Sequence, residues 1–173
     1  MSVKDFKLVL LFSAMSIVFG LSWTVVLYFF KVGAFDLVYK GGIIVAMVYS
    51  AIMLYYFKKS RVEYLFSHAM VMSMILNFFF SFFVALTMFI MLDMHEQSFL
   101  SISIDVKIDE MLQNKEVYLK TISQENLDLT IESLKLTTPF TTALDFFTKL
   151  SIVGLFYSLI LSLIFKKKNE TRN

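Results

Sequence analysis

The sequence predicts an all-α membrane protein with four transmembrane helices and an extracytoplasmic helical hairpin between the third and the fourth. Three observations support this prediction. The 173 residues are 58% hydrophobic and have a mean hydropathy of +0.72, whereas soluble domains are roughly 45–50% apolar. Four apolar runs are long enough to cross a bilayer. A single polar block, residues 94–138, separates the last two runs, so we expect residues 1–173 to form one four-span domain.

The first span is expected over residues 8–30, because no charged side chain occurs between Lys7 and Lys31. About 20 residues suffice to cross the hydrocarbon core of a membrane. The run is longer than the apolar part of a secretory signal, and no small-residue cleavage pattern follows it. We therefore expect it to be retained as an anchor.

The second span is expected over residues 36–57 and the third over residues 66–92. The uncharged part of the second begins only at Gly41, so the Lys40 side chain must extend toward the interface if the helix starts near residue 35. The third span contains no ionisable side chain apart from His68, which lies at its beginning. A hydrated His68 at the interface is the simpler interpretation, and proton or metal binding is its alternative.

The fourth span is expected over residues 143–165, at the end of a helix that starts earlier. Thr138 is predicted to cap that helix, and Pro139 suits its first position, where a missing N–H costs nothing. Asp145 and Lys149 are four residues apart and are expected to pair outside the lipid.

Basic residues gather in three segments that four crossings place on one side of the membrane. The residues predicted to fix this topology are Lys58, Lys59, Arg61, Lys166, Lys167 and Lys168. By the positive-inside rule, both termini are expected in the cytoplasm.

The polar block is expected to form two amphipathic helices. Leu100, Ile104, Ile108 and Met111 recur at intervals of three and four, and Ser123 is predicted to cap the second helix. The block is acidic, whereas helices that adhere to anionic lipid are rich in lysine and arginine. We therefore expect it to pack on the bundle or on another membrane or extracytoplasmic protein.

Small or polar residues recur every four positions in all four spans. They are Ser16, Gly20 and Thr24 in the first span, Gly42, Ala46 and Ser50 in the second, Ala69, Ser73, Asn77, Ser81 and Ala85 in the third, and Gly154, Ser158 and Ser162 in the fourth. Such ridges let helices approach closely in lipid, so we expect them to meet at the bundle axis. In the alternative, Ser73, Asn77 and Ser81 line a polar path.

Several kinds of chemistry find no support in the sequence. No Asp, Glu, Lys or Arg lies near the centre of a span, which argues against an ion-coupled transporter. No phosphate-binding, dinucleotide or metalloprotease motif is present, there is no cysteine, and a net charge of +2 without a basic stripe excludes nucleic acid. We expect no enzyme activity, no cofactor and no metal.

Two clusters of acidic residues could be read either as solvent-exposed helix surface or as a site. Asp93, His95 and Glu96 are interpreted as a hydrated helix end, with the active site of a lipid-modifying enzyme as the weaker hypothesis. A second group, Asp105, Asp109 and Glu110, is interpreted as a solvated helix face, because it lacks the alternating ligands of a calcium loop.

Three stretches carry a resemblance to a known family: YFKKSRVEYLFSHAM, SFLSISIDVKIDEMLQ and TPFTTALDFFTKLSIVGLFYSLILSLIFKKK. With the order of the spans, they make the chain similar to small four-span proteins of Gram-negative bacteria that are grouped as a domain of unknown function. The resemblance covers nearly the whole chain and implies an inner-membrane protein with a helical insert. It implies no established activity and no site residues.

The sequence thus favours a non-enzymatic membrane protein that serves as a structural or accessory subunit of a membrane assembly. The alternative is a small-solute permease or channel component, built as an oligomer, with the polar ridge of the third span as its path.

Overall fold

The computed structural model describes residues 3–29, 35–60, 66–94 and 98–166, and these form helices without any strand. In chain order the helices are α1 (Val3–Phe29), α2 (Phe35–Ser60), α3 (Phe66–Met94), α4 (Ser98–Gln113), α5 (Lys115–Tyr118), α6 (Gln124–Lys135) and α7 (Pro139–Phe165). Four of them are long and apolar enough to cross a membrane: α1, α2, α3 and α7. The prediction of an all-helical protein with four spans is confirmed.

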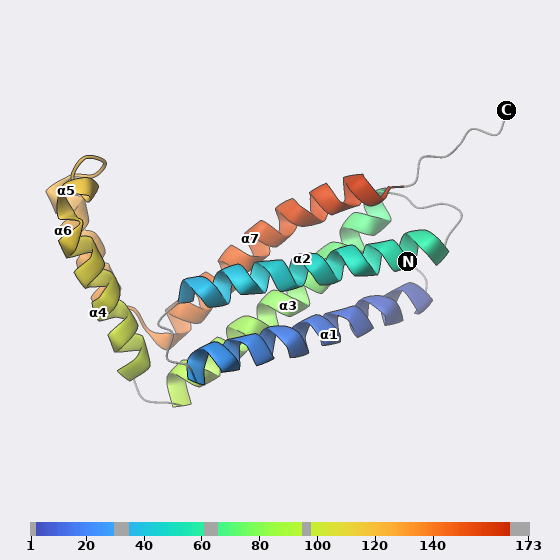
Figure 1. Cartoon of the computed structure of the whole chain (residues 1–173), viewed down its shortest axis with the longest axis horizontal. Coiled ribbons are helices and arrows are strands. Elements are labelled where there is room, and N and C mark those ends of the chain that lie inside the picture. Colours follow the sequence, from blue (N-terminus) through green and yellow to red (C-terminus); the bar gives the residue numbers. More distant parts are fainter. Residues whose placement is uncertain (1–2, 30–34, 61–65, 95–97, 167–173) are drawn as a thin grey trace.

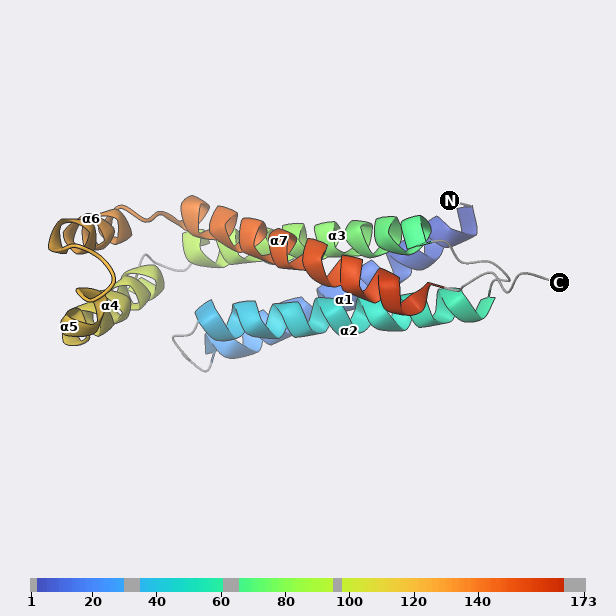
Figure 2. The same cartoon turned by 90° about the horizontal axis from the view of Figure 1, so that it is seen from above.

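The four long helices lie side by side in a bundle (Figure 1, Figure 2). Helix α3 is the central element: it packs against α1, α2 and, most extensively, α7. Helix α2 also packs against α1 and α7. Helix α1 begins and α7 ends at one end of the bundle, while α4, α5 and α6 stand at the other end (Figure 1).

Apolar side chains fill the bundle and also cover its outside. Met53, Leu76 and Phe80 are fully buried between the spans, whereas Val18 and Phe156 are about two-thirds exposed, at 65% and 68%. A helix that is apolar on all sides suits a lipid environment, because lipid-facing positions gain nothing from polar side chains.

The caps of two helices confirm the sequence predictions. At α7, the Thr141 backbone N–H donates to the Thr138 hydroxyl at 3.2 Å, and the Thr138 N–H donates to the Thr141 hydroxyl at 2.8 Å. Pro139 occupies the first turn. At α6, the Ser123 hydroxyl accepts from the backbone of Asn126 at 3.2 Å. These local motifs satisfy N–H groups that have no partner within the helix.

The observed helices differ from the predicted ones in two respects: where α1 begins, and the presence of α5. Helix α1 begins at Val3, five residues before the expected span, because a helix can continue beyond the lipid. In this first turn the Asp5 side chain packs against the protein and is 6% exposed. The one-turn helix α5 was not predicted. Helix α2 begins at Phe35, as expected if Lys40 reaches the interface. Residue 30 and the connections 31–34 and 61–65 lie outside the described residues.

The hairpin consists of α4 and α6, joined through α5, and runs across the end of the bundle rather than continuing along its axis (Figure 1). Ile108, Met111 and Leu127 are buried within it. At its base, Leu100 packs with Leu92 of α3 and Phe146 of α7. The hairpin is therefore anchored to the bundle at its base, and α5 lies at its distant tip (Figure 1).

Candidate functional site

Buried polar side chains form the most distinctive feature of the bundle interior. All four spans contribute, and each of these residues is at most 3% exposed: Ser13, Ser16, Thr24, Ser50, Ser73, Asn77, Ser81, Ser158 and Ser162. The predicted small residues Gly20, Gly42, Ala46, Ala69, Ala85 and Gly154 are buried as well. We refer to the contact of Asn77, Tyr157, Gly154, Ser73 and Ser158 between α3 and α7 as the polar node.

At the centre of the polar node, the Tyr157 hydroxyl donates a hydrogen bond of 2.6 Å to Oδ1 of Asn77. The Asn77 amide lies directly on the backbone of α7 at Gly154, where any Cβ atom would collide with it. An amide in hydrocarbon costs several kcal/mol if it has no partner. Tyr157 supplies that partner, and Gly154 supplies the space for the amide.

A second bond joins the same two helices, since the Ser73 hydroxyl donates to the Ser158 hydroxyl at 2.9 Å. Ser73 and Asn77 are four residues apart on α3, and Gly154 and Ser158 are four apart on α7, so each pair shares one helix face. The Ser162 hydroxyl continues the row but donates to the backbone carbonyl of Ser158, at 2.6 Å. The node thus joins α3 to α7 over two turns.

The glycines of α1 and α2 make room for large side chains rather than for another helix backbone. Gly20 receives the ring of Phe80, and Gly41 receives the indole of Trp23; in both places a Cβ atom would overlap the aromatic side chain. A Cβ atom at Gly42 would meet Leu150 and Phe80 at ordinary contact distances of 3.6 and 3.7 Å. Of these glycines, Gly20 and Gly42 belong to the predicted ridges, and the side chains nearest to both are large rather than small.

Some buried hydroxyls stay outside the hydrogen-bond network. Among the described residues, Ser13, Ser50 and Ser81 have no hydrogen-bond partner. Ser50 lies close to the Tyr157 hydroxyl, but outside hydrogen-bonding geometry. The Ser16 hydroxyl donates to the Ser13 carbonyl at 2.8 Å, within α1. Among the described residues, the hydrogen bonds of the polar ridge between helices join α3 to α7.

The pattern of small and polar residues in the sequence did not single out Tyr157, because it falls outside the four-residue spacing of Gly154, Ser158 and Ser162. A signal was nevertheless present: a phenol deep within a span needs a hydrogen-bond partner for the same reason as an amide. Tyr157 also follows Gly154 by three positions, which places both on one helix face.

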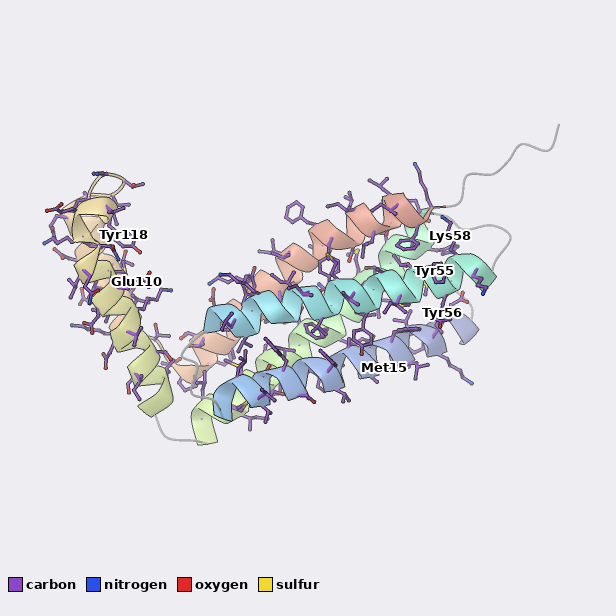
Figure 3. All side chains as sticks on the ribbon, in the orientation of Figure 1. Met15, Tyr55, Tyr56, Lys58, Glu110 and Tyr118 are labelled. Atoms are coloured by element: carbon purple, nitrogen blue, oxygen red, sulfur yellow. The ribbon has the colours of Figure 1, made fainter. Side chains whose placement is uncertain are left out.

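The expected cationic groups lie at the end of the bundle opposite the hairpin, where described. Lys58 is half-buried, and its Nζ lies 5.9 Å from the ring centre of Phe165. Lys59 and Lys166 are exposed, and Tyr55 and Tyr56 lie beside Lys58 on α2 (Figure 3). The other predicted topology residues, Arg61, Lys167 and Lys168, lie outside the described residues.

The acidic residues and histidines considered as candidate sites do not form a metal site in the part of the chain that the structure describes. No three His, Cys, Asp or Glu side chains there lie close enough to hold a metal ion. His68 and Asp93 are exposed, and so are Asp105, Asp109 and Glu110 on α4. His95 and Glu96 lie outside the described residues.

Comparison with known proteins identifies one family. Residues 11–167 match the family described as "Protein of unknown function (DUF4199)". No curated protein and no solved structure matches the chain. The matched region runs from α1 to the end of α7, and so includes the whole polar node and the hairpin. This chain is therefore a member of the DUF4199 family.

Proposed function

We propose that this chain is a non-enzymatic membrane protein that serves as a structural or accessory subunit of an inner-membrane assembly. The hydrogen bond between Tyr157 and Asn77 carries the proposal. A solute path or a reaction centre needs polar atoms that its substrate can reach. Here the Asn77 amide, near the middle of α3, is 3% exposed and is bonded to a neighbouring helix of the same chain, as expected of a packing contact.

The hairpin is the proposed contact with a partner protein. Helix α4 buries one apolar face in the protein but also exposes Ile102 and Val106, at 58% and 57%. These two residues are four apart, so they form one patch on the outer face of α4. Exposed acids surround the patch, including Asp105 and Asp109. An apolar patch with an acidic rim suits a partner of apolar and basic character.

The proposed orientation places the hairpin outside the cytoplasm and both termini inside. It rests on the basic residues at the end of the bundle where α1 begins and α7 ends, because lysine and arginine near span ends favour the cytoplasmic side. Among the described residues these are Lys7, Lys58, Lys59 and Lys166.

The test is to extract the protein gently from its native membrane and determine the particle mass by native mass spectrometry. We expect a second protein in fixed ratio. The double variant Ile102→Ser/Val106→Ser should lose it, whereas Leu136→Ser should retain it. Leu136 is a suitable control because it is more exposed, at 74%, but lies outside the α4 patch.

A particle that contains only copies of this chain would contradict the accessory role. It would favour the alternative, an oligomeric permease or channel component with Ser73, Asn77 and Ser81 beside its path. That alternative has its own test, since a cysteine at position 77 would then react with a membrane-impermeant thiol reagent. A cysteine buried in the polar node would not.

A further inference from the structure

A cavity of about 570 Å³ lies where the hairpin meets the bundle. Helix α4 contributes Leu100 and Lys107, α7 contributes Phe146 and Lys149, and α2 contributes Tyr39. The volume lies within the range of small-ligand sites, roughly 300–1,000 Å³. Leu134 of α6 also lines it, so both hairpin helices and two spans form the cavity, and it exists only when the hairpin is packed on the bundle.

The lining of the cavity combines apolar and polar side chains. Leu100 and Phe146 belong to the apolar cluster at the base of the hairpin, and Tyr39 meets the Phe146 ring edge-on at 6.5 Å between ring centres. The polar part includes Lys107, Lys149 and several hydroxyls. A lining of this kind suits an amphiphile whose headgroup and first methylene groups enter together.

The charge of the polar part is positive. Lys149 pairs with Asp145, Nζ to Oδ2 at 2.6 Å, and so is neutralised locally. Lys107 has no ion-pair partner among the described residues. Asp105 and Asp109 are each two positions from Lys107, so they project from the other side of α4, whereas Glu110 shares the face of Lys107 but forms no ion pair with it. Lys107 is therefore a cation at the cavity that no direct ion pair neutralises among the described residues.

The charge pattern of α7 puts the cavity beside the expected edge of the hydrocarbon region. The uncharged part of α7 begins at Leu150, directly after Lys149, so this lysine marks the edge of the hydrocarbon region. Lys107 lies on α4, outside the spans. A headgroup beside this edge can reach Lys107 while its chains remain in the bilayer.

We propose that this cavity binds the phosphate group of one anionic phospholipid. Lys107 contacts the phosphate, the spare donors of Lys149 assist, and the first methylene groups of an acyl chain lie against Leu100 and Phe146. This differs from adhesion of the hairpin to the membrane surface, which its acidic character disfavours. The bound lipid would hold the base of the hairpin against the bundle.

The test uses the full-length protein in mild detergent, with phosphatidylglycerol or phosphatidylcholine added, and counts retained lipids by native mass spectrometry. We expect one phosphatidylglycerol to be retained in preference to phosphatidylcholine. Lys107→Gln should lower its apparent affinity about fivefold, from roughly 1 kcal/mol for a lysine near an anionic lipid surface. Lys120→Gln, which removes an exposed lysine remote from the cavity, should have no effect.

Two further arms separate the possible outcomes. Thr137→Phe places a ring into the cavity without changing charge, and it should also abolish selective retention. Soluble glycerol phosphate should not displace the lipid; displacement at low millimolar concentration would show that the site takes a free phosphate and would overturn the lipid assignment. Equal retention of the two lipids, or equal losses in Lys107→Gln and Lys120→Gln, would overturn the proposal.

Discussion

Asn77 shows how one polar residue in a span acquires a structural role. Its side chain needs a hydrogen-bond partner, and it meets the Tyr157 hydroxyl at 2.6 Å. Its volume needs space, and it lies over Gly154, the residue of α7 that has no side chain. The two requirements are met by residues three positions apart, so a single face of α7 is specific for a single position of α3.

Substitution of Gly154 tests the packing half of this arrangement. In Gly154→Ala the new Cβ would overlap the Asn77 amide, so α3 and α7 must separate or the amide must turn away. We expect a loss of roughly 1–3 kcal/mol in the free energy of unfolding, as for other overpacked sites. The measurement is reversible unfolding in mixed detergent micelles, followed by circular dichroism.

Gly42→Ala is the matched control for this experiment, because it makes the same change in a neighbouring span. There the Cβ atom would meet Leu150 and Phe80 only at van der Waals distances. We expect little change or a small gain, because alanine favours the helix. Equal losses at positions 42 and 154 would show that helix packing at the node is not specific.

A double-mutant cycle tests the hydrogen bond. Tyr157→Phe and Asn77→Ala, alone and together, should show a coupling of roughly 0.6 kcal/mol and at most about 1.7 kcal/mol, the range measured for bonds between membrane helices. Tyr49→Phe provides the control, since Tyr49 contacts the Phe19 ring and has no hydroxyl partner among the described residues. Strictly additive effects at positions 77 and 157 would contradict the bond.

For Asn77, the sequence predicted that the side chain needs a hydrogen-bond partner, but not that the partner is Tyr157. The position of Asn77 in an apolar run requires a buried hydrogen bond, and this follows from the physics of hydrocarbon alone. The partner is 80 residues away, and its identity depends on the register between α3 and α7. That register comes from the packing of many side chains, which no local pattern contains.

At the scale of the helix, the start of α7 can be tested by removing one hydroxyl. Thr138→Val keeps the branched shape but leaves the Thr141 N–H without its acceptor. Loss of an N-cap costs about 1 kcal/mol, so a lower unfolding temperature is expected. Thr148→Val should be nearly neutral, because the exposed Thr148 hydroxyl only donates to the Leu144 carbonyl within its own helix. A larger loss at position 148 would contradict a role for the cap.

The helix ends were predictable where local chemistry determines them. Ser123 and Thr138 cap their helices as expected, because a cap requires only residues within one turn. The way the hairpin crosses the end of the bundle could not be predicted. It depends on packing of Leu100 with Leu92 of α3 and Phe146 of α7, and Phe146 is separated from Leu100 by the whole hairpin.

For the molecule as a whole, the bundle separates its charges by end. Lys58 and the neighbouring Tyr55 and Tyr56 lie at one end, and the acidic hairpin, with Glu110 and Tyr118 toward its tip, lies at the other (Figure 3). A membrane crossed by the four spans would keep these ends on opposite sides. Which end faces the cytoplasm is then a single choice for the whole molecule.

That choice is directly testable because the chain contains no cysteine, so one introduced thiol reports one position. Glu116 and Lys166 are both exposed and lie on the hairpin and at the end of α7, respectively. With a membrane-impermeant reagent, we expect Glu116→Cys to be labelled in spheroplasts and Lys166→Cys to be labelled only after permeabilisation. The reverse pattern would invert the orientation, and would place the proposed partner contact and lipid site on the cytoplasmic side. Labelling of both positions in intact spheroplasts would contradict a membrane-spanning α7, because the single span between the hairpin and the end of α7 requires the two to lie on opposite sides.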